Sequence, residues 1–140
     1  MIESSLNSGR VVVDGKFFRV DSKKFHVKGV TYGPFSPDAT GQTFGAAERV
    51  VEDFKQLREL GANLLRVYYV PPRWFLDLAA GHGLKLLIDV PWPKHLCFFE
   101  NYEIQQQAGA AVRQAAEACK DHPGVFGLSV VNEIPAEIVR

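Results

Sequence analysis

A carboxylate and an amide stand side by side at Asn132-Glu133, directly after the apolar run at residues 125–131. Such a run is typical of a buried parallel strand, which places the pair at the strand's carboxyl end. Barrel enzymes carry their catalytic groups at that end of their strands. A carboxylic acid there can protonate a departing oxygen and then, as a carboxylate, deprotonate an incoming water. Glu133 is therefore a candidate general acid/base.

Aromatic and polar side chains also gather where the other expected strands end. Aromatic faces stack on sugar rings while polar groups bind the hydroxyls, so this mixture indicates a saccharide-binding mouth. In a half barrel the aromatic residues could equally pack against a partner, and a lone histidine is more often a surface residue than a ligand. The expected substrate-binding residues are Tyr32 at the end of the run 27–32, Tyr68 in the run 63–69, and Trp92 and His95 after the run 84–90.

Arg66 lies inside an apolar strand, where an unpaired charge is costly. We expect its guanidinium to face either a wet, ligand-binding mouth or a structural ion-pair partner. Asp89 and Glu133 are the candidate partners, because both are expected at the ends of neighbouring strands.

The elements that must position these side chains alternate along the chain. A polar leader at residues 1–10 precedes a short antiparallel β-hairpin at 11–27, and Asp14-Gly15 supplies its turn. Apolar residues then follow helical spacing in three segments, and Phe54 and Trp74 are expected in the core rather than in the site. The expected strands are 27–32, 63–69, 84–90 and 125–131, and the expected helices are 46–60, 71–81 and 102–120.

Strands that are apolar on both faces and alternate with helices indicate a parallel sheet covered by helices. Both an open doubly wound sheet and half of a barrel fit this order. The first strand is followed by residues 32–37, YGPFSP, which hold neither GxGxxG nor GxxxxGK[ST]. The expected fold class is thus α/β, half of a TIM (β/α)8 barrel, with about four parallel βα units in a single domain over residues 11–140.

Composition narrows the classes of function. The 140 residues are 46% hydrophobic, enough for a packed core, and 16 basic residues balance 16 acidic ones, so no nucleic-acid partner is expected. Cys97 and Cys119 lack the spacing of metal ligands and are expected to be reduced thiols, with no metal and no cofactor. No apolar run reaches the roughly 18 residues of a membrane span, and the leader is polar, so we expect a cytoplasmic protein that does not bind membranes.

Three segments carry a family resemblance: FHVKGV at residues 25–30, LGANLLRVY at 60–68, and Asn132-Glu133. Together they resemble the N-terminal half of clan A glycoside hydrolases, the (β/α)8 retaining enzymes that include β-galactosidases, β-glucuronidases, cellulases and mannanases. The resemblance runs from about residue 11 to residue 140. It implies that Glu133 is the acid/base, that Asn132 binds the substrate 2-hydroxyl, and that Arg66 steadies the nucleophilic carboxylate.

The same resemblance places the nucleophile, a glutamate, at the end of a seventh strand that this sequence does not contain. Retaining chemistry needs two carboxyl groups about 5 Å apart. We therefore expect a glycoside hydrolase-like half-barrel with an incomplete retaining β-glycosidase site that is inactive alone. The alternative is a noncatalytic module that self-associates or binds a saccharide. A third interpretation, an open domain that binds a phosphorylated ligand, is disfavoured because the glycine-rich loop is missing.

Half of a barrel exposes two strand edges and the side chains that would face the missing strands. A two-fold homodimer would cover both and complete eight strands. We expect such a dimer, with a saccharide as its ligand.

Overall fold

The structure is a computed structural model that describes residues 9–138. It opens with a three-stranded antiparallel sheet in the order β1 (Val11–Asp14), β2 (Phe17–Val20) and β3 (Lys23–Phe25). Gly15, at a φ of +63°, provides the left-handed residue that the tight turn between β1 and β2 requires. The antiparallel unit expected over residues 11–27 is thus present as three short strands. The expected polar leader lies almost entirely outside the described residues.

The second sheet is parallel and has four strands. They lie in the order β4 (Gly29–Thr31), β5 (Leu64–Val67), β6 (Lys85–Asp89) and β7 (Val125–Ser129), which is also their order along the chain. A helix connects each strand to the next, as parallel pairing demands. This strand order confirms the α/β half-barrel predicted from the sequence, since it advances in one direction like the strands of a barrel.

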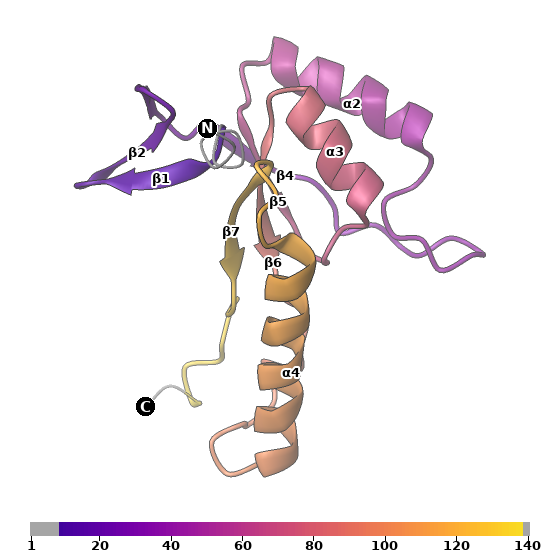
Figure 1. Cartoon of the computed structure of the whole chain (residues 1–140). Coiled ribbons are helices and arrows are strands. Elements are labelled where there is room, and N and C mark those ends of the chain that lie inside the picture. Colours follow the sequence, from indigo (N-terminus) through magenta and orange to yellow (C-terminus); the bar gives the residue numbers. More distant parts are fainter. Residues whose placement is uncertain (1–8, 139–140) are drawn as a thin grey trace.

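Three helices cover one side of this sheet: α2 (Ala47–Glu59), α3 (Arg73–Gly81) and α4 (Tyr102–Cys119) (Figure 1). The Asn101 side chain caps α4 by accepting a hydrogen bond from the Ile104 amide at 3.1 Å. Pro72 precedes α3, where a residue without an amide hydrogen costs nothing. Gly61 follows α2 at a φ of +87°. The predicted helix boundaries therefore agree closely with those observed.

The core lies between the helices and one face of the parallel sheet. Leu65 and Val67 on β5 and Leu86 and Ile88 on β6 are fully buried there. Phe54 of α2 belongs to the same cluster, as predicted, and Trp74 of α3 packs partly buried against it. Because side chains alternate along a strand, these residues leave the intervening positions for the other face.

That other face is the one that would line a closed barrel. The register aligns Thr31 of β4 with Arg66 of β5, Arg66 with Leu87 of β6, and Leu87 with Gly127 of β7. Arg66 thus lies in a row of side chains on the side opposite the buried core. No helix of the described chain covers this face (Figure 1).

The antiparallel sheet packs near the amino-terminal end of the parallel strands. Phe126 of β7 contacts Phe18 edge to face, with ring centroids 4.8 Å apart, and lies 6.2 Å from Phe25. Nearby, the Lys85 ammonium donates to the carbonyls of Gly9 and Pro123, and burial lowers the pKa of Lys85. These contacts lie at the opposite end of the strands from Asp89, the last residue of β6.

After β7 the chain forms a turn at residues 136–138, so the fourth strand is followed by a turn rather than by a helix within the described residues.

Among the described helices, none is long and apolar enough to cross a membrane. The cytoplasmic location stays a prediction.

Candidate functional site

The Arg66 guanidinium joins two neighbouring strands and the segment after β7. Its Nη2 donates to Oδ2 of Asp89 over 3.3 Å and also to Oδ1 of Asn132. Of the two ion-pair partners considered from the sequence, the structure therefore pairs Arg66 with Asp89. The hydrogen bond from Arg66 to Asn132 brings Asn132, which is 66 positions away in the chain, to the end of β5.

The pairing leaves hydrogen-bonding capacity unused. The Asp89 side chain is 6% exposed and that of Arg66 is 30% exposed. Both Nε of Arg66 and Oδ1 of Asp89 are buried and have no hydrogen-bond partner among the described residues. Lys94 supplies a second positive charge 3.8 Å from Oδ1 of Asp89, while its ammonium donates to the Val90 carbonyl over 2.9 Å. Leaving a buried N–H without an acceptor is costly in free energy, and Arg66 Nε is such a donor among the described residues.

Glu133 follows Asn132 and is exposed. Its φ is +49°, a left-handed conformation that is uncommon for a residue with a Cβ atom and is often found at functional sites. Among the hydrogen bonds and ion pairs of residues 9–138, none involves the Glu133 side chain. Its carboxyl group is therefore available to solvent or to a ligand beside the Arg66–Asn132 contact.

Two of the predicted aromatic residues lie near this contact. The Arg66 guanidinium carbon sits 5.1 Å from the centre of the Tyr68 ring, a cation–π distance. The Trp92 indole donates to the Val130 carbonyl over 2.7 Å, which ties the loop after β6 to the end of β7. Its ring also contacts Phe98 edge to face at 5.3 Å. His95 is exposed in the same loop, three residues beyond Trp92.

Tyr32 is not brought to this group. Its hydroxyl donates to Oδ2 of Asp53 on α2 over 2.7 Å, and Oδ1 of Asp53 accepts from Arg49 Nε over 3.1 Å. Burial, followed by the hydrogen bond to the Asp53 carboxylate, raises the pKa of the Tyr32 phenol. The ring packs against Phe54 and Phe75, so the side chain lies in the helix layer.

The structure adds residues that the sequence reasoning did not assign to a site. Lys94 lies in a loop whose pattern gives no signal, and only its position five residues after the Asp89 strand end could have suggested it. Arg49 and Asp53 show the i, i+4 spacing of a helical ion pair, which is recognisable but common.

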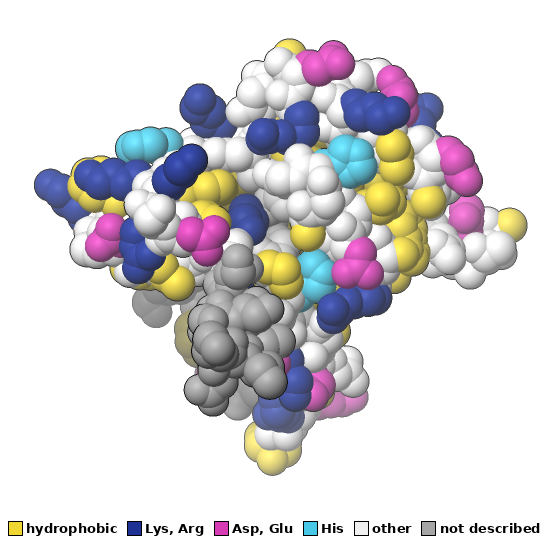
Figure 2. Space-filling model, turned by 45° about the horizontal axis from the view of Figure 1, so that its top comes forward, with side chains coloured by type: hydrophobic (Ala, Val, Ile, Leu, Met, Phe, Trp, Pro, Cys, Tyr) yellow, Lys and Arg dark blue, Asp and Glu magenta, His cyan; other side chains and the backbone are white. Residues whose placement is uncertain are grey.

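Among residues 9–138, no group of three or more His, Cys, Asp or Glu side chains is placed to hold a metal ion. Acidic and basic side chains are interspersed on the face shown in Figure 2.

Comparisons with known proteins bear on the fold of the chain. The chain is 28% identical over 89 residues, 61% of its length, to the 1,3-β-glucanosyltransferase gel1 of Aspergillus fumigatus. Its structure resembles that of the β-glucuronidase of Bifidobacterium dentium, with a TM-score of 0.72 and 22% identity over 90% of this chain. It also resembles Gas2, with a TM-score of 0.65 and 21% identity over 90% of this chain. No family model matches the chain.

The chain spans only part of each of these proteins: 20% of the A. fumigatus transferase, 20% of the β-glucuronidase and 32% of Gas2. These likenesses confirm the resemblance to glycoside hydrolases and the half-barrel fold. The chain is glycoside hydrolase-like, and the roles of its individual residues are taken up below.

Proposed function

We propose that this chain carries the acid/base half of a retaining β-glycosidase site, with Glu133 as general acid/base. The observation that supports this most is the Arg66 guanidinium, which holds Asn132 in place at the strand ends and leaves Glu133 beside it, exposed and unpaired. In this proposal Asn132 also binds the 2-hydroxyl of the sugar, and Arg66 orients a nucleophilic carboxylate.

The partly exposed guanidinium of Arg66 gives the nucleophile its binding point. Its side chain is 30% exposed, so a carboxylate brought to the open face of the sheet would accept a charge-assisted hydrogen bond from the guanidinium. Asp89 cannot fill that role itself, because Arg66 and Lys94 already neutralise it. The proposed nucleophile therefore comes from outside the four described strands.

The reaction then runs in two steps. The nucleophilic carboxylate attacks the anomeric carbon while protonated Glu133 gives its proton to the departing glycosidic oxygen. In the second step Glu133, now a carboxylate, takes a proton from water as the water displaces the enzyme carboxylate from the anomeric carbon. The guanidinium of Arg66 stabilises the negative charge of the nucleophile before attack and again as it departs.

Sugar recognition is assigned to the aromatic residues at the mouth. Tyr68, Trp92 and His95 lie on the elements that surround the Arg66–Asn132 contact, and a pyranose ring could stack on the two aromatic planes. Tyr32, which was expected to bind the substrate, lies in the helix layer and is not assigned to this mouth. The names of the similar proteins point to β-linked glucuronides and glucans as the substrates to test first.

A complement must cover the open face of the sheet. Strands β4 and β7 are its outer strands in the described structure, and each has one side without a neighbour. For the chain by itself we propose a second copy as that complement, related by a two-fold axis that pairs β7 of one copy with β4 of the other. Analytical ultracentrifugation at micromolar concentration should give a dimer mass, and a monomer throughout would refute this part.

Turnover tests the catalytic assignment. The chain and any larger assembly that contains it should be assayed with aryl β-glucuronides and aryl β-glucosides. Where turnover occurs, Glu133→Gln should reduce it by at least about a hundredfold, the usual contribution of a general acid/base. Glu137→Gln, an exposed neighbour, is the control and should leave it unchanged. Equal turnover in both variants would contradict the role of Glu133.

A noncatalytic saccharide-binding module is the second candidate. The observation in its favour is that Asp89, the other carboxylate at the mouth, is already engaged in ion pairs. Saturable binding of a β-glycoside without turnover in any assembly, and with no effect of Glu133→Gln, would favour this function over the first.

A further inference from the structure

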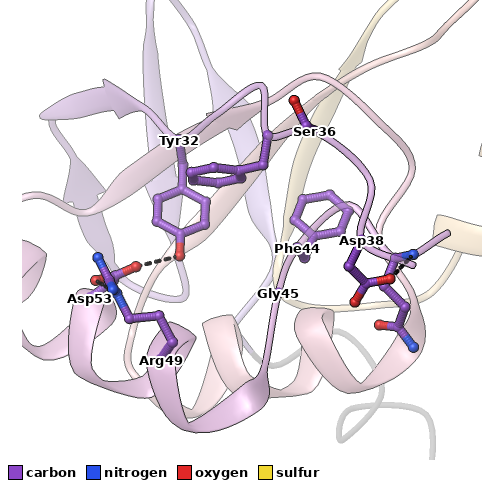
Figure 3. A pocket seen from close by; sticks show the side chains of 9 residues that line it. Tyr32, Ser36, Asp38, Phe44, Gly45, Arg49 and Asp53 are labelled. Atoms are coloured by element: carbon purple, nitrogen blue, oxygen red, sulfur yellow. Dashed lines mark hydrogen bonds and ion pairs between the residues drawn. The ribbon is translucent and has the colours of Figure 1, made fainter. Parts of the chain in front are cut away.

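A cavity of about 290 Å³ lies between α2 and the loop that follows β4, on the opposite side of β4 and β5 from Arg66. Its volume is at the small end of the range for ligand pockets, which suits a single ring rather than an oligomer. Figure 3 shows the Tyr32 hydroxyl turned toward Asp53, with Arg49 beside it and Phe44 and Asp38 across the cavity. Its lining residues come from one strand end, one loop and one helix.

The floor of the cavity is made of aromatic side chains. Phe44 is 6% exposed and Tyr32 is 9% exposed, so both rings are fixed by the core. Phe35 contacts the Tyr32 ring edge to face at 5.0 Å and is 41% exposed, which leaves part of its surface free. An aromatic surface of this kind can stack on the C–H face of a sugar ring.

The rim is held by Asp38. Its Oδ1 accepts from the amide of Thr40 at 2.8 Å, the hydroxyl of Thr40 at 2.6 Å and the amide of Gln42 at 3.0 Å. The hydrogen bond from the Thr40 hydroxyl is the main cause that lowers the pKa of Asp38, so the group stays a carboxylate. None of the hydrogen bonds within residues 9–138 uses its Oδ2, which leaves a charged acceptor for a ligand hydroxyl.

Hydrogen-bond donors also line the cavity. Among the hydrogen bonds of residues 9–138, Arg49 uses only Nε, which donates to Asp53, so its two Nη groups are available to a ligand, and its side chain is 79% exposed. Ser36 and Gln42 add a hydroxyl and an amide to the lining. The cavity therefore offers acceptors and donors around an aromatic floor. With two carboxylates against one guanidinium, the local charge disfavours an anionic ligand.

From this chemistry we propose that the cavity is a binding site for one neutral pyranose ring, separate from the Glu133 mouth. Asp38 Oδ2 accepts hydrogen bonds from ring hydroxyls, the Arg49 guanidinium donates to others, and Phe35 stacks on the ring. This site does not depend on the acid/base proposal, because it shares no residue with Arg66, Asn132 or Glu133.

Titration of the ¹⁵N-labelled chain with methyl β-D-glucopyranoside tests the proposal by amide chemical shifts. Saturable shifts are expected at Ser36, Gln42 and Gly45, with an affinity in the millimolar range. Asp38→Asn keeps an oxygen for the loop amides but removes the charged acceptor, and Arg49→Gln removes the charged donor. Each should weaken binding about tenfold.

The matched control is Glu52→Gln, an exposed carboxylate on the same helix that is absent from the cavity lining. It should leave the shifts at Ser36, Gln42 and Gly45 and their saturation unchanged. Glucuronate should bind more weakly than the neutral glycoside. The proposal is overturned by shifts confined to the mouth, by no saturation, by binding indifferent to both Asp38→Asn and Arg49→Gln, or by glucuronate binding as tightly.

Discussion

Arg66 and Asp89 form an ion pair across neighbouring parallel strands, with 3.3 Å between Nη2 and Oδ2, on the face of the sheet that no described helix covers. The guanidinium of this pair has two hydrogen-bond partners. Asp89 accepts a hydrogen bond from the guanidinium, and the guanidinium also donates to Asn132, the residue before Glu133. A chain of contacts that begins at a buried carboxylate thus reaches the residue that precedes the proposed acid/base.

Removing the anchor should cost stability. Asp89→Asn leaves the Arg66 guanidinium without its counter-charge, and the 30% exposure of Arg66 lets water relieve part of the penalty. We expect a loss of about 1–3 kcal/mol in the free energy of unfolding, measured by urea denaturation. Lys55→Gln breaks an exposed pair with Glu52 and should cost less than about 1 kcal/mol. A loss for Asp89→Asn no larger than that of this control would refute the anchoring role.

The antiparallel sheet should depend on one aromatic contact. Phe18→Ala removes the edge-to-face contact with Phe126 and the apolar area buried with it. We expect a destabilisation of about 1–3 kcal/mol and faster amide exchange in β1–β3. Val13→Ala, in the same sheet but 74% exposed, should stay within about 0.5 kcal/mol of the parent chain. If both variants unfold alike, the sheet is not held through Phe126.

Alkaline pH should reveal the Tyr32–Asp53 hydrogen bond. The pKa of Tyr32 is raised above the ordinary value of about 10, so the folded chain retains a proton that the unfolded chain loses. The stabilising contribution is therefore complete below pH about 10 and is lost as pH rises through the folded pKa. Phenolate absorbance should therefore show a component that ionises above the ordinary tyrosine range, and this component belongs to Tyr32.

Tyr32→Phe is the check on that assignment. It should delete the late-ionising component of the absorbance curve and flatten the dependence of stability on pH above about 10. A curve in which the parent chain and this variant both lack a late component would show that Tyr32 titrates normally.

The two cysteines should differ in reactivity. Cys97 is exposed, whereas Cys119 is 4% exposed and burial raises the pKa of its thiol. A thiol reagent should modify Cys97 at once and Cys119 only as the chain unfolds, because the thiolate is the reactive form. Mass spectrometry of peptides from a time course would measure both rates. Equal rates under native conditions would mean that α4 does not hold Cys119 in the core.

The sequence predicted the elements well because their periodicities are strong. The buried runs at Leu64–Val67 and Lys85–Asp89 and the amphipathic helix Ala47–Glu59 were recognisable without tertiary information. The strands proved shorter than the apolar runs that suggested them. Apolar residues at the ends, such as Val130 and Val131, are partly exposed because they continue past the last ladder hydrogen bonds.

The direction of Tyr32 was beyond sequence reasoning. Thr31 aligns with Arg66, and alternation along the strand then sends Tyr32 to the helix side, yet only the observed register reveals this. The ion pairing of Arg66 was easier to predict, since a charge within an apolar strand requires a partner. Lys94 was missed because its contact with Asp89 depends on the path of an irregular loop, which leaves no periodic signal.

Affinity labelling tests the central claim, that Glu133 occupies the acid/base position of a sugar-binding mouth. An N-bromoacetyl β-glycosylamine places its amide nitrogen where the glycosidic oxygen would lie and its reactive carbon two bonds beyond that nitrogen. A nearby carboxylate oxygen attacks that carbon, bromide leaves, and an ester forms. The experiment uses Cys97→Ser, so that the exposed thiol does not consume the reagent. We expect peptide mass spectrometry to find the ester on Glu133, with saturable kinetics and protection by excess parent sugar. Labelling of Glu133 no faster than of exposed Glu52 or Glu137, and unaffected by the competing sugar, would contradict the account.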